Sequence, residues 1–267
     1  MAQVIVAERV TKSFELDGGR EVMAIRDLDL AVDEGEFVCL VGGSGCGKTT
    51  FLNMAAGFVQ PTSGRLLLRG EPISGVEPRC GMIFQSYALF PWKTVLGNVE
   101  FGLKMQGVDA RRRRELAERF IKLVNLDGFE QFYPGELSGG MQQRVTLARM
   151  LAADPEVFLM DEPFAALDAM TRQVMQEELI RIHEQSRKTT IFVTHNIDEA
   201  ILLSDRIVVM SARPGRVKVS IDNDLPRPRP LEIQLDPRFL ELKASVWGQV
   251  EEEVRLHIAS TAHAGGE

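Results

Sequence analysis

The chain has 267 residues, of which 45% are hydrophobic and 26% charged, so it can bury a sizeable apolar core as one large domain or a domain with an insert. Its formal net charge of −7 argues against a general nucleic-acid binder, because such proteins carry a basic face. No apolar run reaches the ~20 residues of a membrane-spanning helix, and the N-terminal residues lack a signal-peptide pattern, so we expect any membrane role to depend on partners.

The first part of the chain is expected to be mainly β-structure. Clustered or alternating β-branched residues and short apolar runs predict strands at residues 3–10, 22–32, 36–41, 65–69 and 81–84. A turn is expected at 17–19, and a helix over 48–56 that ends at Gly57.

The spacing of apolar residues becomes helical in the middle of the chain, with helices expected at 111–124 and 141–152. After residue 156, short apolar strands alternate with helices, a pattern typical of a parallel sheet. The expected strands are 157–160, 190–194 and 206–210, and the expected helices 170–186 and 197–203. We therefore predict an α/β domain into which a helical subdomain, about 89–152, is inserted.

A proline-rich stretch at 226–230 marks a predicted boundary. The main domain is expected over residues 1–225. Residues 226–267 are expected to form a C-terminal extension with one amphipathic helix over 236–258 and a flexible tail from Ala259.

One glycine-rich segment matches the full phosphate-loop pattern G-x-x-x-x-G-K-[ST] between a predicted strand and a predicted helix. Its backbone N–H groups and the helix N-terminus are suited to phosphate oxygens, with Lys48 on the β- and γ-phosphates and Thr49 on magnesium. The alternative is a glycine-rich turn with an incidental lysine. The candidate nucleotide-binding residues are Gly42, Gly43, Ser44, Gly45, Cys46, Gly47, Lys48, Thr49 and Thr50.

Two acidic residues, Asp161 and Glu162, end the apolar strand predicted at 157–160. Carboxylates at the end of a buried strand are costly unless they have a function. Asp161 is a candidate magnesium ligand, and Glu162 a candidate base for the attacking water. The alternative is a pair of solvated acids that open a turn.

Residues 137–144 read LSGGMQQR, and here the chain resembles the ATP-binding cassette (ABC) family, whose signature is LSGGQ. The match departs from that signature at Met141. The resemblance extends from about residue 4 to residue 219. It implies a P-loop NTPase (RecA-like) core with an N-terminal antiparallel β-subdomain and an inserted α-helical subdomain.

The resemblance also implies roles for further residues. Gln85 corresponds to a glutamine that senses magnesium and the attacking water, and His195 to a histidine that contacts the γ-phosphate. Asp168 corresponds to a loop at the dimer seam, and Phe14 to an aromatic residue under adenine. The alternatives are a loop glutamine, a core histidine, a helix cap and a core phenylalanine. The catalytic candidates are thus Glu162, His195, Gln85 and Lys48, and the metal-binding candidates Thr49, Gln85 and Asp161.

Two chains of the family pair head to tail around ATP. The resemblance therefore implies that Ser138, Gly139 and Gly140 of one chain close over ATP held by residues 42–49 of a second copy. Hydrolysis would then open the dimer.

The string LFPW-x-TV-x-GNV, which starts at Leu89, resembles the nitrate, sulfonate and taurine importer subfamily. That resemblance implies an ATPase at the cytoplasmic face of the membrane, which binds permease subunits directly and serves an extracytoplasmic substrate-binding protein indirectly. The expected cofactors are ATP and Mg²⁺, and no nucleic-acid partner is expected. The alternatives are an ATPase of another ABC transport class, such as an exporter, a non-transport ABC ATPase, and a catalytically silent subunit.

Overall fold

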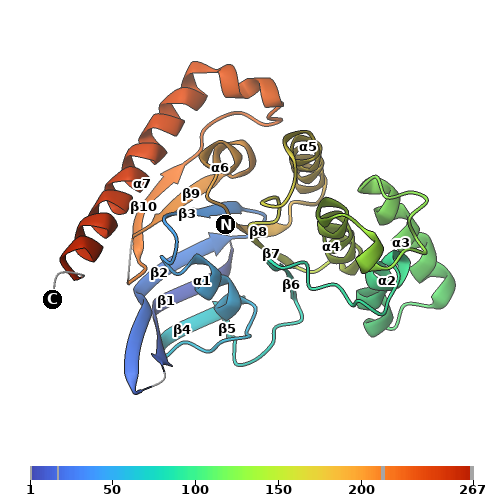
Figure 1. Cartoon of the computed structure of the whole chain (residues 1–267), viewed down its shortest axis with the longest axis horizontal. Coiled ribbons are helices and arrows are strands. Elements are labelled where there is room, and N and C mark those ends of the chain that lie inside the picture. Colours follow the sequence, from blue (N-terminus) through green and yellow to red (C-terminus); the bar gives the residue numbers. More distant parts are fainter. Residues whose placement is uncertain (1, 17, 212–213, 265–267) are drawn as a thin grey trace. The chain divides into compact units, whose positions relative to one another are not determined.

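The computed structural model describes residues 2–264 except Asp17 and residues 212–213, and it divides the chain into two compact units (Figure 1). The first unit comprises Met1–Glu77 and Leu179–Glu267, and the second Pro78–Glu178. The division falls within helix α5 (Ala169–Ser186). The predicted extension at 226–267 lies in the first unit, and the predicted division at residue 225 stays a prediction.

The first unit contains an antiparallel sheet with the strand order β2-β1-β4-β5. The strands are β1 (Gln3–Leu16), β2 (Arg20–Asp33), β4 (Ser63–Leu68) and β5 (Glu71–Pro72). The pairing of β1 with β2 shifts register between Ala7 and Val10, and both of these residues are buried although they lie three positions apart. Such an irregularity returns the apolar side chains to the core face. The expected antiparallel subdomain is confirmed.

A second set of strands in this unit has the order β10-β9-β3-β8. The strands are β3 (Phe37–Val41), β8 (Thr189–Val193), β9 (Arg206–Met210) and β10 (Val217–Asp222). Strand β3 pairs in parallel with both β8 and β9, whereas β10 is antiparallel to β9. Every residue of β3 and β8 is buried, which is typical of parallel strands covered on both faces. Strand β10 was not predicted.

The helical elements of the first unit include α1 (Lys48–Ala55), α6 (Ile197–Leu203), η2 (Leu231–Leu235) and α7 (Pro237–Ala264). Helix α7 packs against α6, and its buried residues Phe239, Leu242 and Val246 follow helical spacing (Figure 1). Helix α7 extends past the predicted end at residue 258 to Ala264, and the flexibility predicted from Ala259 stays a prediction. Residues 265–267 lie outside the described residues.

The second unit contains the parallel pair β6 (Cys80–Ile83) and β7 (Val157–Asp161). Helices α2, α3 and α4 pack against one another (Figure 1). Their bounds, with those of a short 3-10 helix, are Val95–Met105 for α2, Ala110–Leu123 for α3, Pro134–Glu136 for η1 and Gly139–Ala153 for α4. Thr94 and Asp109 cap α2 and α3 with their side-chain oxygens, so local sequence sets both helix starts.

Within the described part of the chain, no helix is both long enough and apolar enough to cross a membrane.

Candidate nucleotide-binding and catalytic site

The phosphate loop connects buried strand β3 to helix α1, and glycines determine its shape. Gly42, Gly45 and Gly47 all have positive φ, and Gly47 is the N-cap of α1. A Cβ atom at Gly42 would lie 2.8 Å from the Met210 carbonyl oxygen, and one at Gly47 would lie 2.7 Å from Ile25 Cγ1. Glycine is therefore required for both conformation and space. The loop predicted from sequence has the expected strand–loop–helix setting.

The Lys48 side chain folds back over this loop. It is 8% exposed, and its Nζ atom donates to the carbonyl oxygens of Gly42 at 2.8 Å and Gly43 at 3.0 Å. Nζ also lies 3.4 Å from the buried Cys46 Sγ. Thr49 is exposed, and the first turn of α1 carries no acidic residue. A buried cation beside a helix N-terminus favours an anionic ligand such as a phosphate group.

His195 follows the end of strand β8, next to the end of strand β3 from which the phosphate loop starts. Strands β3 and β8 pair in register from Phe37↔Thr190 to Leu40↔Val193, so the segments that follow them emerge at the same edge. The Thr194 amide donates to the Leu40 carbonyl oxygen at 3.3 Å. His195 itself is exposed, which excludes the alternative of a core histidine. Within the first unit, the structure thus brings His195 and the phosphate loop together.

Phe14 lies on the antiparallel sheet, where it pairs with Val22. Its side chain is 39% exposed, and Lys12 Nζ lies 5.0 Å from the ring centroid. The alternative of plain core packing is therefore wrong. The exposed ring is suited to stacking on a base, and that role stays a prediction.

The second unit holds the acidic pair and Gln85 at one edge of its parallel strands. Strands β6 and β7 pair from Cys80↔Val157 to Ile83↔Met160, so Gln85 and the end of β7 follow neighbouring strand ends. Asp161 is 3% exposed, Glu162 is half-buried and Gln85 is exposed. Glu162 has φ of 49°, a left-handed conformation that costs roughly 1–3 kcal/mol and is concentrated at functional sites.

The signature segment starts helix α4. The Ser138 Oγ atom accepts a hydrogen bond from the Met141 amide at 3.3 Å and caps the helix. The neighbouring Tyr87 packs against this start: a Cβ atom at Gly139 would lie 2.6 Å from Tyr87 Oη. The Tyr87 carbonyl oxygen accepts a hydrogen bond from Thr146 Oγ1 at 2.9 Å. The structure thus places the loop of Gln85 against the signature helix, a contact that the sequence did not indicate.

This packing predicts a conditional effect of Gly139→Ala. In the wild-type background the added methyl group meets the Tyr87 hydroxyl, so we expect overpacking to destabilise the chain by about 1 kcal/mol. With Tyr87→Phe the nearest remaining atom is Cζ at 3.6 Å, and the helix propensity of alanine should then stabilise it by up to about 1 kcal/mol. Urea unfolding of the two single variants and the double variant measures this change of sign. The same effect in both backgrounds would refute the contact.

Asp168 caps helix α5. Its Oδ1 atom accepts from the Thr171 amide at 3.0 Å, and Oδ2 accepts from Thr171 Oγ1 at 2.7 Å. The backbone and side-chain hydrogen bonds from Thr171 lower the pKa of Asp168 below its usual value. The helix-cap alternative is therefore confirmed, whereas a contact of Asp168 with nucleotide or with a second chain stays a prediction.

The sequence over residues 25–165, more than half of the chain, matches the ABC transporter family. This chain belongs to the ABC transporter family. Membership implies nucleotide binding and ATP hydrolysis coupled to transport. The mixed α/β architecture is that of an ABC ATPase cassette, as the resemblance implied.

Curated relatives cover most of the chain. An uncharacterised ABC transporter ATP-binding protein of Methanocaldococcus jannaschii is 51% identical, over 92% of this chain and 91% of its own length. The taurine import ATP-binding protein of Roseobacter denitrificans is 43% identical, over 90% of this chain and 92% of its own. The bicarbonate transport ATP-binding protein of Synechococcus elongatus is 41% identical over 92% of this chain, which spans 38% of that longer protein.

Solved structures of ABC cassettes resemble the chain in fold. The dimeric structure of a bacterial ABC transporter cassette has a TM-score of 0.76 and 32% identity, over 83% of this chain and all of that one. A dimeric structure of a post-hydrolysis cassette bound to ADP and phosphate has a TM-score of 0.76 and 31% identity over the same shares.

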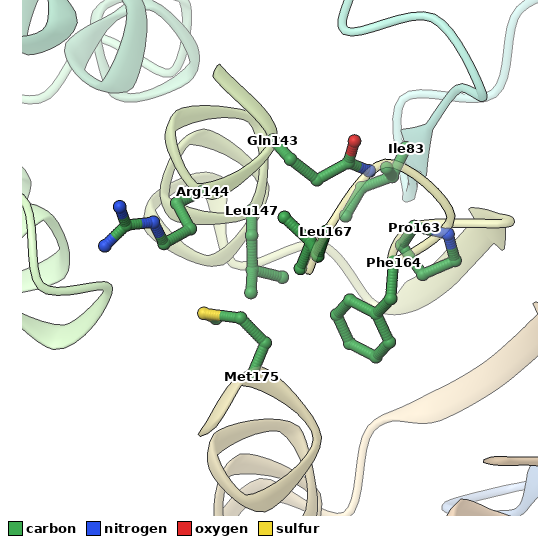
Figure 2. Close-up of a pocket in the computed structure, with 8 residues that line it drawn as sticks. All are labelled: Ile83, Gln143, Arg144, Leu147, Pro163, Phe164, Leu167 and Met175. Atoms are coloured by element: carbon green, nitrogen blue, oxygen red, sulfur yellow. The ribbon is translucent and has the colours of Figure 1, made fainter. Parts of the chain in front are cut away.

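A small pocket of the ABC cassette lies within the second unit, beside the segment that follows Glu162 (Figure 2). Figure 2 shows Leu147, Leu167 and Phe164 gathered near Met175, with the Arg144 guanidinium directed away from them. That guanidinium donates to the Val124 and Asn125 carbonyl oxygens. The pocket is apolar, which is typical of side-chain packing beside the segment that follows Glu162 and not of a phosphate site. It is lined by Ile83, Gln143, Arg144, Leu147, Pro163, Phe164, Leu167 and Met175.

One residue of the catalytic region was missed from the sequence. Glu199 is 5% exposed, and its carboxylate accepts a hydrogen bond from the Thr194 hydroxyl, next to His195. The helix was predicted at 197–203, and the pattern N-x-x-E from Asn196 to Glu199, a capping signal, could have identified Glu199 as part of its start.

Proposed function

We propose that this chain is the ATP-hydrolysing subunit of an ABC importer for a small anion of the nitrate, sulfonate or taurine type. The observation that carries the proposal is the buried Lys48 in a glycine-shaped loop beside the exposed His195, in a member of the ABC transporter family. The taurine and bicarbonate functions named for relatives at 41–43% identity support small anions as the cargo class.

In this proposal each candidate residue has a chemical role. Lys48 and the loop amides bind the β- and γ-phosphates of ATP, and the Phe14 ring stacks on adenine. Glu162 accepts the proton of the water that attacks the γ-phosphate, while Gln85 orients that water and His195 contacts the γ-phosphate. Asp168 contributes to the seam between two copies of the chain.

The residues present are suited to magnesium bound together with a nucleotide. The described part of the chain has no group of three metal-ligating His, Cys, Asp or Glu residues. Magnesium bound with phosphates needs only one or two carboxylates, and in this proposal Asp161, the Thr49 hydroxyl and Gln85 would hold the ion. The ion would supply charge neutralisation at the β- and γ-phosphates.

The proposed assembly contains two copies of the chain and a membrane permease. Ser138, Gly139 and Gly140 of one copy would close over ATP held by residues 42–50 of the other. The dimeric cassettes among the structural relatives support this arrangement. The chain would lie peripherally on the cytoplasmic face of the membrane, bind the permease subunits directly and serve an extracytoplasmic substrate-binding protein indirectly.

Growth of a deletion strain tests the cargo class. Loss of growth with taurine or an alkanesulfonate as sole sulfur source, restored by the gene but not by its Lys48→Ala variant, would identify a sulfonate importer. Loss of growth only with nitrate as sole nitrogen source would identify a nitrate importer. Normal growth on both, in a strain that lacks other importers for these anions, would contradict the subfamily assignment and leave the ATPase activity to be tested by hydrolysis assays.

A further inference from the structure

Helix α6 begins directly after His195, and side-chain bonds join the two. Asn196 caps the helix by accepting from the Glu199 amide at 3.2 Å. The Thr194 hydroxyl donates to the Glu199 carboxylate and accepts from the Asn196 amide at 3.0 Å. His195 is therefore held between two residues that are bonded to the first turn of α6. We therefore expect a displacement of α6 to move His195 with it.

The other end of α6 is capped by residues far along the chain. Asn223 Nδ2 donates to the carbonyl oxygens of Ile201 at 2.7 Å and Ser204 at 2.8 Å. The Arg229 guanidinium, 2% exposed, donates to the same two carbonyl oxygens. Arg227 donates to the Leu203 carbonyl oxygen at 2.7 Å. Carbonyl groups at a helix C-terminus lack partners within the helix, and here the C-terminal segment supplies them.

Arg229 is an unusual cap because its charge is buried. Burial lowers the pKa of Arg229 to about 10, so the guanidinium remains a cation at neutral pH. The burial of a cation is stabilised by the negative end of a helix dipole and by hydrogen bonds that its N–H groups donate. Arg229 makes such bonds to four backbone carbonyl oxygens, at Ile201, Ser204, Asn223 and Leu225.

Helix α7 reaches the beginning of α6 as well. Lys243 Nζ lies 2.7 Å from Asp198 Oδ1 and donates to Oδ2 at 2.9 Å. Asp198 is in the first turn of α6, three residues after His195. The same C-terminal segment thus bonds to α6 at both ends.

We propose that the segment from Asn223 to Lys243 is a positioning element for His195, in which Lys243 and Arg229 act through helix α6. A helix of seven residues has little stability of its own, so its position depends on tertiary contacts. Displacement of a catalytic group by about 1 Å can cost up to about 100-fold in rate. This inference rests on the proposed ATPase function and on the role assigned there to His195.

Lys243→Ala is the first test, with Lys218→Ala as its matched control. Lys218 on β10 also joins α7 to the unit, through Gln249 and Glu252, but it does not bond to α6. In steady-state ATP hydrolysis we expect Lys243→Ala to lower kcat about threefold to fivefold with little change in KM for ATP. Lys243→Arg should restore the rate, and Lys218→Ala should leave it unchanged.

A double-variant comparison tests whether the effect passes through His195. Lys243→Ala should lower the rate in the wild-type background and have no further effect when His195 is already alanine. An equal loss in both backgrounds, or an equal loss with Lys218→Ala, would overturn the proposal, because either result indicates a general loss of stability.

Hydrogen–deuterium exchange of the nucleotide-free chain gives a readout independent of activity. We expect Lys243→Ala and Arg229→Lys to speed exchange in a peptide over residues 194–204 and to leave strand β3 unchanged. A wild-type chain that does not hydrolyse ATP would contradict the proposed function. The exchange data would in that case still test whether Lys243 and Arg229 hold helix α6 and His195 in place. An active Lys243→Ala chain with wild-type rate and exchange would overturn the positioning role alone.

Discussion

Glu162→Gln is expected to form a stable dimer when ATP is present. The substitution removes the proposed base and keeps the shape of the side chain, so hydrolysis should fall by about 100-fold or more while ATP binding persists. The substitution should not add backbone strain, because glutamine adopts the left-handed conformation of residue 162 at a free-energy cost similar to that of glutamate. Multi-angle light scattering with saturating ATP should then give twice the monomer mass of 29.8 kDa.

Two controls make this result specific. Glu162→Gln combined with Lys48→Ala should remain monomeric, because ATP should then bind too weakly to join two copies. Glu162→Gln combined with Ser138→Arg should bind ATP and remain monomeric, because the bulky side chain blocks the signature surface at the exposed start of α4. If Glu162→Gln alone is monomeric with saturating ATP, closure of a dimer around ATP is refuted.

Lys48→Ala should abolish hydrolysis, with a fall in rate of roughly 100- to 1000-fold. The substitution removes a buried cation from a loop in which its Nζ atom bonds to the carbonyl oxygens of Gly42 and Gly43. Without that charge the loop has only its amides and the helix end to hold the phosphates. A fluorescent ATP analogue should therefore also bind more weakly.

Lys104→Ala is the matched control for this loss, because Lys104 is an exposed lysine near the end of α2. It should hydrolyse ATP at the wild-type rate. Thermal unfolding of both variants must show that each is folded. Hydrolysis by Lys48→Ala at more than about a tenth of the wild-type rate would refute the assigned phosphate contact.

The agreement between sequence and structure is closest where function depends on consecutive residues. Residues 42–49 form a loop that needs glycine at positions with positive φ, followed by a helix whose first residue is Lys48. Such demands are local, so the sequence pattern alone identified the loop and its setting. The end of β7 was predicted for the same reason. An apolar run followed by two acidic residues can be identified without knowledge of the rest of the fold.

Prediction was weaker for side chains that the sequence pattern allowed to be either buried or exposed, or to have either of two roles. The sequence allowed Phe14 to be core or exposed and His195 to be buried or accessible, and the structure shows both side chains exposed. Asp168 could cap a helix or contact a partner, and the structure shows the cap. Strand β10 was missed although its six residues, VKVSID, alternate strictly between apolar and polar side chains, so the signal for this strand was present in the sequence.

The sequence by itself determined the family, most but not all of the strands and helices, and the identity of the catalytic candidates. The tertiary structure alone decided which distant residues support them: Tyr87 against Gly139, Arg229 on the end of α6, and Lys243 on Asp198. Periodicity reports which face of one element is buried, but it carries no information about which element covers that face. These partners lie from 25 to 52 residues apart, so only the folded chain brings them together.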